Sequence, residues 1–497
     1  MAPGLLVDES SSPCAAPDMG VSPPMSNPTP IATTNGGRRS RRSPLLKRSV
    51  RSLPLWLKSA KGSWLVVTDG VKTWRVFDAS GGAAVSNIGH GDRRVHDAIR
   101  AQEQTGVAYA ASMSFDTEVV WQFADHLLES TGDEMAEVVF YSSGSEAAEA
   151  AQKLAYQYQS RLKREPQPGR RWFIARDRSY HGATLGALAV GGHKGRKDMY
   201  KQILPSNTQF ISPCNPYRDM DEGETVVQYI DRLADELDRK ICELGPETVA
   251  GFFMEPVVGA ALGCVPALPG YLAAMKKVCK KYGVLLILDE IMCGMGRTGY
   301  MHAWQEEGVV PDIQMVGKGL AGGYAPMSAL LVGPEVVNAL GDDCFAHGHT
   351  FQNFPAGCAA GLAVQKIVEE DKLLDNVKDK GDKLMKKLVA RLGDHAHVGN
   401  IRGAGLFRGI EFVRDKATKT PFDSEAAVAW RIHEQGLKDG YNLYVYPGSG
   451  TVDGERGDHI IIAPAFNITD ADVDMIVERV RKLVVDFFED FNKTAKL

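Results

Sequence analysis

Five branched aliphatic residues follow one another from Val284 to Leu288, and two carboxylates, Asp289 and Glu290, come directly after them. A strand without polar alternation suits burial on both faces, as in a parallel sheet that is covered by helices. In open α/β sheets, ligands bind beyond the carboxyl ends of the strands. This run therefore predicts an α/β fold in which Asp289 meets a ligand.

The rest of the patterned chain supports a mostly parallel sheet between helices. Strand-like and helix-like segments alternate along it, which is typical of that architecture. A hairpin is predicted around Asp69-Gly70, and a capped helix from Thr469 to about Phe488. The expected strands lie at 138–141, 172–175, 248–254, 284–288, 313–316 and 460–462, and the expected helices at 146–159, 225–244, 270–282 and 356–368.

Composition excludes several classes of protein. The 497 residues carry a net charge of -5, so no global basic field calls for nucleic acid or a membrane surface. The uncharged stretch from Val257 to Met275 contains prolines and glycines and is predicted to be a buried loop, not a membrane span. The eight cysteines form no C-x-x-C pair, which indicates reduced thiols and a cytoplasmic protein.

Residues 1–52 differ from the remainder. They are rich in Ser, Pro and Gly, which predicts a disordered tail. A basic cluster lies within this segment, between Arg38 and Arg51, and it leaves organelle targeting open as an alternative to a solvated tail.

Four short motifs could bind a cofactor, and each also has an ordinary structural interpretation. Ser143-Gly144-Ser145 lies between a strand and a helix, where free N–H groups bind phosphate, but it could equally be a helix cap. Tyr180 could stack on a flat ring or be a core aromatic. Lys318, between two glycines, could form an imine or be a loop lysine, and Thr350 could donate to a phosphate.

Together, Asp289 and Lys318 form the pair that pyridoxal phosphate (PLP) chemistry requires, an acid that faces a ring nitrogen and an imine-forming lysine. His347 and His349 lack further ligands nearby in the sequence, so no metal site is expected.

The order of these motifs closely resembles the class III PLP-dependent aminotransferases of fold type I. The resemblance runs from about Leu53 to Phe488. It rests on Asp78–Gly82, Asn87–Gly91, Ser143–Glu149, Tyr180–Gly182, Glu255-Pro256, Leu288–Gly299, Lys318-Gly319, His349–Phe351 and Ile401–Leu406.

The resemblance implies a large PLP-binding domain, residues 106–369, and a smaller α+β domain built from 53–105 and 370–497. It implies a homodimer with shared active sites. It also implies roles for single residues: Lys318 as the Schiff-base lysine, Asp289 on the pyridine nitrogen, Tyr180 and Ile291 on the two ring faces, Ser143, Gly144 and Ser145 at the phosphate, Thr350 at the partner's phosphate, His181 and Glu255 beside the cofactor, and Arg402 on a substrate carboxylate.

The chain departs from the family at one position that concerns Arg402. Many members carry a glutamate that neutralises this arginine, where the present chain has Ala260. The gating of Arg402 and the substrate class therefore stay open.

The predicted activity is transfer of an amino group, including an ω-amino group, from an amine or amino acid to a 2-oxo acid by a ping-pong mechanism. The alternatives are an aminomutase or a decarboxylase on the same scaffold, and a catalytically inactive dimeric binding protein.

Overall fold

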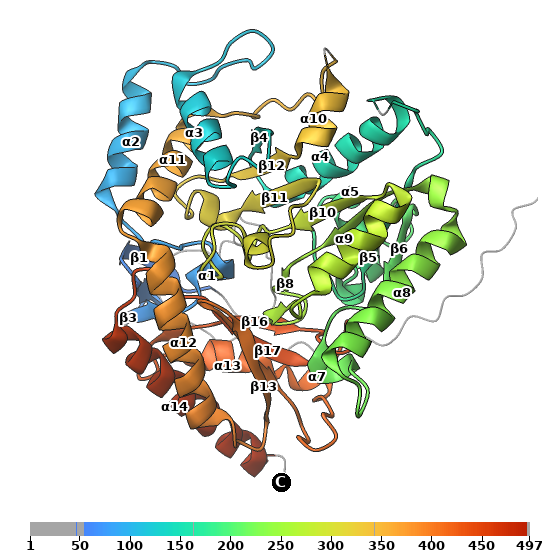
Figure 1. Ribbon diagram of the computed structural model, residues 1–497. Coiled ribbons are helices and arrows are strands. Elements are labelled where there is room, and N and C mark those ends of the chain that lie inside the picture. The colour runs from blue at the N-terminus through green and yellow to red at the C-terminus, as the bar shows by residue number, and fades with distance from the viewer. Residues whose placement is uncertain (1–45, 47–53, 163, 342, 495–497) are drawn as a thin grey trace, which may run out of the picture. The chain divides into compact units, whose positions relative to one another are not determined.

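The computed structural model describes residues 46, 54–162, 164–341 and 343–494 (Figure 1). The predicted tail, residues 1–52, lies outside these residues apart from Leu46. The unit that begins at Leu55 is described below.

A seven-stranded sheet forms the centre of the larger part of this unit, in the order β4-β12-β11-β10-β7-β5-β6. β12 runs antiparallel to both of its neighbours, and the other recorded pairings are parallel. The prediction of a mostly parallel sheet is therefore confirmed. The strands are β4 (Glu137–Tyr141), β5 (Trp172–Arg176), β6 (Thr208–Ile211), β7 (Val249–Met254), β10 (Leu285–Asp289), β11 (Ile313–Gly317) and β12 (Ser328–Val332).

Helices cover both faces of this sheet (Figure 1). Leu285 and Ile287 of β10 pack on one face with the alanine-rich helix α4 (Gly144–Gln157). Leu286 and Leu288 pack on the other face with α8 (Val226–Leu244) and α9 (Tyr271–Tyr282). Alternate side chains of β10 thus enter two apolar cores, which explains why its sequence shows no polar alternation.

A four-stranded sheet combines segments from both ends of the described chain. The predicted hairpin forms, with a turn at Asp69, whose Oδ1 accepts hydrogen bonds from the N–H groups of Val71 and Lys72 at 2.8 Å each. A late strand then pairs in parallel with the hairpin, Leu443 opposite Phe77. The strands of this sheet are β1 (Trp56–Lys61), β2 (Trp64–Thr68), β3 (Thr73–Asp78) and β15 (Leu443–Tyr444).

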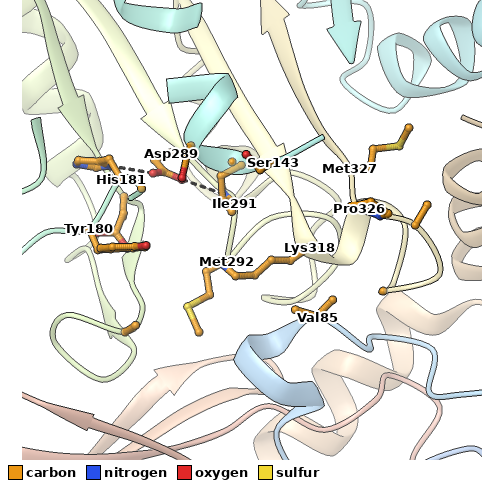
Figure 2. A pocket seen from close by; sticks show the side chains of 17 residues that line it. Val85, Ser143, Tyr180, His181, Asp289, Ile291, Met292, Lys318, Pro326 and Met327 are labelled. Atoms are coloured by element: carbon orange, nitrogen blue, oxygen red, sulfur yellow. Dashed lines mark hydrogen bonds and ion pairs between the residues drawn. The ribbon is translucent and has the colours of Figure 1, made fainter. Parts of the chain in front are cut away.

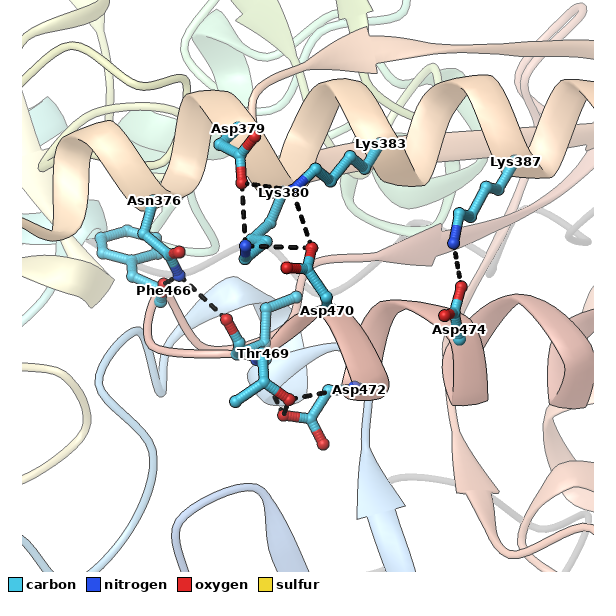
Figure 3. A network of polar contacts seen from close by, with 11 residues as sticks. Asn376, Asp379, Lys380, Lys383, Lys387, Phe466, Thr469, Asp470, Asp472 and Asp474 are labelled. Carbon is cyan, nitrogen blue, oxygen red and sulfur yellow. Dashed lines mark hydrogen bonds and ion pairs between the residues drawn. The ribbon is translucent and has the colours of Figure 1, made fainter.

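A second, antiparallel sheet lies in the C-terminal part, in the order β13-β14-β17-β16. Two long helices pack beside it, and they are joined by a ladder of ion pairs (Figure 3). Asp470 pairs there with Lys380 at 3.0 Å and with Lys383 at 2.9 Å. Exposed pairs of this kind contribute little each. The apolar core therefore supplies most of the stability. These elements are β13 (Val398–Ala404), β14 (Phe407–Phe412), β16 (Tyr446–Ser449), β17 (Asp458–Ile462), α12 (Leu373–Leu392) and α14 (Asp470–Thr494).

Two predicted helices differ from the observed ones at their ends. The helix expected at 146–159 begins two residues earlier, because Ser143 and Glu146 form a capping box, and it continues as a π-helical segment, Tyr158–Leu162. α14 begins as predicted after the Thr469 cap but extends beyond Phe488 to Thr494. The helix expected at 356–368 is α11 (Pro355–Glu370).

α12 approaches the β13–β14 turn closely at Gly381. A Cβ at this position would lie 2.3 Å from the carbonyl oxygen of Gly405. We expect Gly381→Ala to lower the free energy of unfolding by about 1–3 kcal/mol, because overpacking outweighs the helix propensity that alanine adds. Differential scanning calorimetry would show a lower Tm. Ala390→Ser, which adds one atom on the exposed face of α12, serves as the control. An unchanged Tm for Gly381→Ala would contradict the close approach.

Candidate active site

A cavity of about 500 Å³ opens at the carboxyl ends of the central strands. Residues that follow five different strands meet there, as expected for an open α/β sheet. Figure 2 shows Tyr180 at the left of the view and Lys318 near its centre, with Asp289 and His181 above them. The lining includes Val85, Ser143, Gly144, Ser145, Tyr180, His181, Glu255, Ala260, Asp289, Ile291, Met292, Lys318 and Met327.

Asp289 is fixed by two hydrogen bonds at the end of β10. Its Oδ2 lies 2.8 Å from His181 Nδ1, and its Oδ1 accepts from the Ile291 N–H at 3.0 Å. Both Asp289 and His181 are buried, and His181 Nε2 has no hydrogen-bond partner among the described residues. The carboxylate is therefore oriented before any ligand binds.

The second carboxylate of the pair points away from the cavity. Glu290 is fully buried and accepts hydrogen bonds from the N–H groups of Ala303 at 2.6 Å and Trp304 at 3.0 Å. Burial raises the pKa of Glu290 to about 7, although these hydrogen bonds oppose the rise. Glu290 thus caps a short 3₁₀ helix, Ala303–Glu306, and only Asp289 of the two lines the cavity.

Lys318 follows β11 on a sharply turned backbone. Its φ of 46° lies in the left-handed region, which a residue with a side chain rarely adopts. The flanking glycines allow close packing, since a Cβ on Gly317 would lie 3.0 Å from Ile291 and one on Gly319 would lie 3.1 Å from Asn87. Burial lowers the pKa of the Lys318 amine below its usual 10.5, and the charges of Asp289 and Glu255 oppose this shift. The amine is thereby easier to deprotonate.

The first turn of α4 presents free donors to the cavity. Glu146 accepts from the N–H groups of Ser142 and Ser143, at 2.8 and 3.0 Å. Among the described residues nothing accepts a hydrogen bond from the N–H of Gly144 or Ser145. A Cβ on Gly144 would lie 3.0 Å from Ile291. This helix end, with its positive dipole, can hold an anion such as a phosphate.

Glu255 connects two walls of the cavity. It follows β7, and its carboxylate accepts from the N–H of Tyr180 at 3.1 Å and of Gly259 at 3.0 Å. Burial raises its pKa, the charge of Asp289 raises it further, and His181 opposes the rise. Glu255 thereby fixes the backbone from which the Tyr180 ring projects.

Thr350 does not line the cavity of its own chain, and it is exposed. In the same loop, His349 lies 3.5 Å from Glu146, on the first turn of α4. A second cavity of about 420 Å³ reaches from the neighbouring Phe351 to Ala325, Pro326 and Met327, which also line the first cavity.

Arg402 also lies outside the lining. Its guanidinium pairs with the fully buried Glu411 of β14 at 2.5 Å. It also donates from Nε to the carbonyl of Gly263 at 2.9 Å, to the carbonyl of Leu262, and to Asn400 at 3.2 Å. Glu411 therefore supplies the acidic partner that Ala260 cannot. The role of Arg402 on a substrate carboxylate stays a prediction.

Comparison with known proteins agrees with this geometry. A family model described as aminotransferase class-III matches residues 45–484. The chain belongs to the class-III aminotransferase family. An aminotransferase of Gibberella zeae is 48% identical over 435 residues, which cover 87% of this chain and 84% of the relative. An uncharacterised aminotransferase of Schizosaccharomyces pombe is 44% identical over 91% of this chain and 97% of the relative.

Solved structures of transaminases share the fold of this class-III aminotransferase. The omega transaminase from Pseudomonas jessenii in complex with PMP has a TM-score of 0.80 at 29% identity, and covers 88% of this chain and 93% of that one. The predicted fold type I architecture and aminotransferase activity are thus confirmed, and the family implies the use of PLP.

The aminotransferase contains site residues that the sequence analysis missed. Glu411, the partner of Arg402, lies on a different strand. Arg196, whose guanidinium carbon lies 4.4 Å from the centre of the Tyr180 ring, gave no signal because it stands in an ordinary basic stretch. Met292 and Val85 line the cavity without belonging to a polar motif. Among the described residues no group of three or more metal-binding side chains occurs.

No described helix is long and apolar enough to cross a membrane.

The lowered pKa of Lys318 can be measured in the cofactor-free protein. Cyanate carbamylates amines through cyanic acid and the neutral amine, so the rate is constant below the pKa of the amine and falls to half of that value at the pKa. For Lys318 this midpoint should lie at a pH below 10.5. Asp289→Asn should move this midpoint to still lower pH, because it removes a negative charge that stabilises the protonated amine. Peptide mass spectrometry would follow the carbamylation, with exposed lysines of the same digest as reference. A midpoint above 10.5 would show that burial does not control this amine.

Proposed function

We propose that the protein is a PLP-dependent transaminase that moves an amino group from an amine or amino acid to a 2-oxo acid in ping-pong half-reactions. The observation that carries the proposal is that Lys318 and Asp289 enter one cavity from the ends of the adjacent strands β11 and β10. A buried acid and an amine with a lowered pKa are the groups that this cofactor needs from a protein.

The site residues fit the phosphate and the ring nitrogen of PLP. The free N–H groups of Gly144 and Ser145 suit its phosphate, since the helix dipole adds to them. The carboxylate of Asp289 suits its ring nitrogen. Tyr180 and Ile291 supply an aromatic and an aliphatic surface for the two faces of the ring. His181 orients Asp289, and Glu255 holds the backbone of Tyr180.

When bound, PLP supplies an aldehyde that condenses with amines and a ring that accepts electron density. Asp289 would hold the ring nitrogen protonated through opposite-charge stabilisation. Lys318 Nζ would remove the substrate proton from carbon and return it at the aldehyde carbon, and its lowered pKa suits a general base. His181 would keep Asp289 in place during both transfers.

A homodimer with shared active sites is part of the proposal. Thr350 is exposed beside large exposed apolar side chains, of which Phe351 and Tyr109 are in ring contact at 6.4 Å. Exposed apolar groups of this size are typical of interaction surfaces. The second cavity, which reaches from Phe351 to the first, supports entry of a partner's residues toward the cofactor. A cytoplasmic location stays a prediction, and none of the seven described cysteines is in a disulfide.

Lys318→Ala tests the proposed function directly. We expect the variant to lose turnover and to lose the lysine–cofactor bond that borohydride makes permanent, while circular dichroism shows a native fold. Donor and acceptor panels would measure turnover, and stoichiometric dependence on a 2-oxo acid would separate transamination from aminomutase and decarboxylase activity. Near-native turnover in Lys318→Ala would overturn the assignment of the cofactor.

Thr350→Ala should weaken PLP affinity by about 10- to 100-fold, because a charge-assisted hydrogen bond contributes about 1.5–3 kcal/mol. Heterodimers of this variant with Lys318→Ala test the shared site. If Thr350 acts across the dimer, one site of each heterodimer carries both substitutions and the other carries neither. Mixing should then restore sites with native PLP affinity, as measured by fluorescence titration. No recovery in confirmed heterodimers would place Thr350 in the site of its own subunit.

A further inference from the structure

Arg196 lies beside the active-site cavity, behind the lining residue Tyr180, and no carboxylate of the described residues pairs with it. It lies on the short helix α6 (Lys194–Lys197), and its guanidinium carbon is 4.4 Å from the centre of the Tyr180 ring. In the described part of the chain, no acidic side chain pairs with Arg196 and none accepts a hydrogen bond from it. Its charge acts on the catalytic amine, since it contributes to the lowered pKa of Lys318.

The backbone that carries Arg196 is held in place. A Cβ on Gly195 would lie 2.4 Å from the carbonyl oxygen of Gly454, so α6 packs directly on the loop around this residue. His193 Nε2 also lies 3.2 Å from the carbonyl oxygen of Ser449. The start of the Arg196 side chain is therefore fixed, and only its flexible end can adjust to a ligand.

The other arginine considered for substrate binding is already occupied. The hydrogen bonds of Arg402 to Leu262, Gly263 and Asn400, together with its ion pair to Glu411, use all three nitrogens of the guanidinium. Releasing it would leave Glu411 buried, with Arg218 as its one remaining ion-pair partner among the described residues. Breaking a buried pair of this kind costs about 3–5 kcal/mol. The binding free energy of a substrate carboxylate at Arg402 would first have to offset this cost.

The two carboxylates that line the cavity, Asp289 and Glu255, are held by other partners. Asp289 is bonded to His181 and Ile291, and Glu255 is bonded to the backbone of Tyr180 and Gly259. An aromatic ring stabilises a cation only modestly and leaves the planar N–H fork of the guanidinium free. This fork matches the geometry of a carboxylate.

We propose that Arg196 binds the carboxylate of amino acid and 2-oxo acid substrates, and that Arg402 is a structural residue. The proposal rests on the proposed function, because it names the group that this site recognises. The Tyr180 ring orients the guanidinium from one side. Substrates without a carboxylate would gain nothing from Arg196, so this residue sets the preference for acids over simple amines.

A binding experiment tests the proposal without turnover. Propionate and its neutral analogue propionamide would be titrated against the holoenzyme by ligand-observed NMR. We expect Arg196→Gln to weaken propionate binding about 10- to 100-fold and to leave propionamide unchanged, since one charge-assisted pair is lost. Arg196→Lys should fall between the two. Lys194→Gln, which removes a charge from the same helix at a residue paired with Glu455, should match the parent protein.

A kinetic experiment separates substrate recognition from a purely structural role. β-Alanine and β-alaninamide differ only in their carboxylate, and the absorbance of the bound cofactor reports each half-reaction. Arg196→Gln should raise the apparent KM for β-alanine about 10- to 100-fold and leave both the KM for β-alaninamide and the limiting rates near those of the parent.

Three results would overturn the proposal. Equal effects on the charged and neutral ligands would show that Arg196 acts only through Tyr180. Unchanged propionate binding would place carboxylate recognition elsewhere, and a loss of PLP affinity alone would assign Arg196 to the cofactor. Failure of the proposed function looks different, since the parent protein would then show no change in cofactor absorbance with any donor. The NMR titration would still decide whether Arg196 binds a carboxylate.

Discussion

The orientation of Asp289 is the constraint on which the active site depends. A carboxylate at the end of a strand buried on both faces is removed from water, which is unfavourable unless polar groups compensate. His181 and the N–H of Ile291 provide that compensation and at the same time fix both oxygens. The hydrogen bond between His181 and Asp289 also links strand β5, which leads to His181, with strand β10. The geometry of the cofactor site thus follows from the way in which one buried charge is stabilised.

The parts of the structure that could be predicted from the sequence are those with local causes. The run from Val284 to Leu288 predicted a doubly buried strand because its composition allows little else, and Ser143 predicted a helix start because its cap is local. The different fates of Asp289 and Glu290 were not predictable in this way. They depend on His181 and on the N–H groups of Ala303 and Trp304, which only the tertiary fold brings close.

The same reasoning explains why the environment of Arg402 escaped prediction. The sequence shows that Ala260 cannot neutralise this arginine, but it does not show which residue does. Glu411 lies on the neighbouring strand of an antiparallel pair whose register places Arg402 opposite Gly409. Arg218, on the short helix α7 (Pro216–Asp219) that follows strand β6, also donates to Glu411, at 2.5 Å. Two arginines and one carboxylate from three separate segments therefore form a buried cluster that no local pattern could indicate.

This cluster has a consequence for substrate recognition. A buried ion pair contributes little net stability, yet removing one partner is costly because the other charge is left without compensation. An arginine held in this way is a poor choice for a ligand that must bind and leave in every half-reaction. Arg196 is the opposite case, because its backbone is fixed while its guanidinium contacts only an aromatic ring and has no counter-charge among the described residues. A ligand carboxylate meets no competing ion pair there, so its full electrostatic attraction is available for binding.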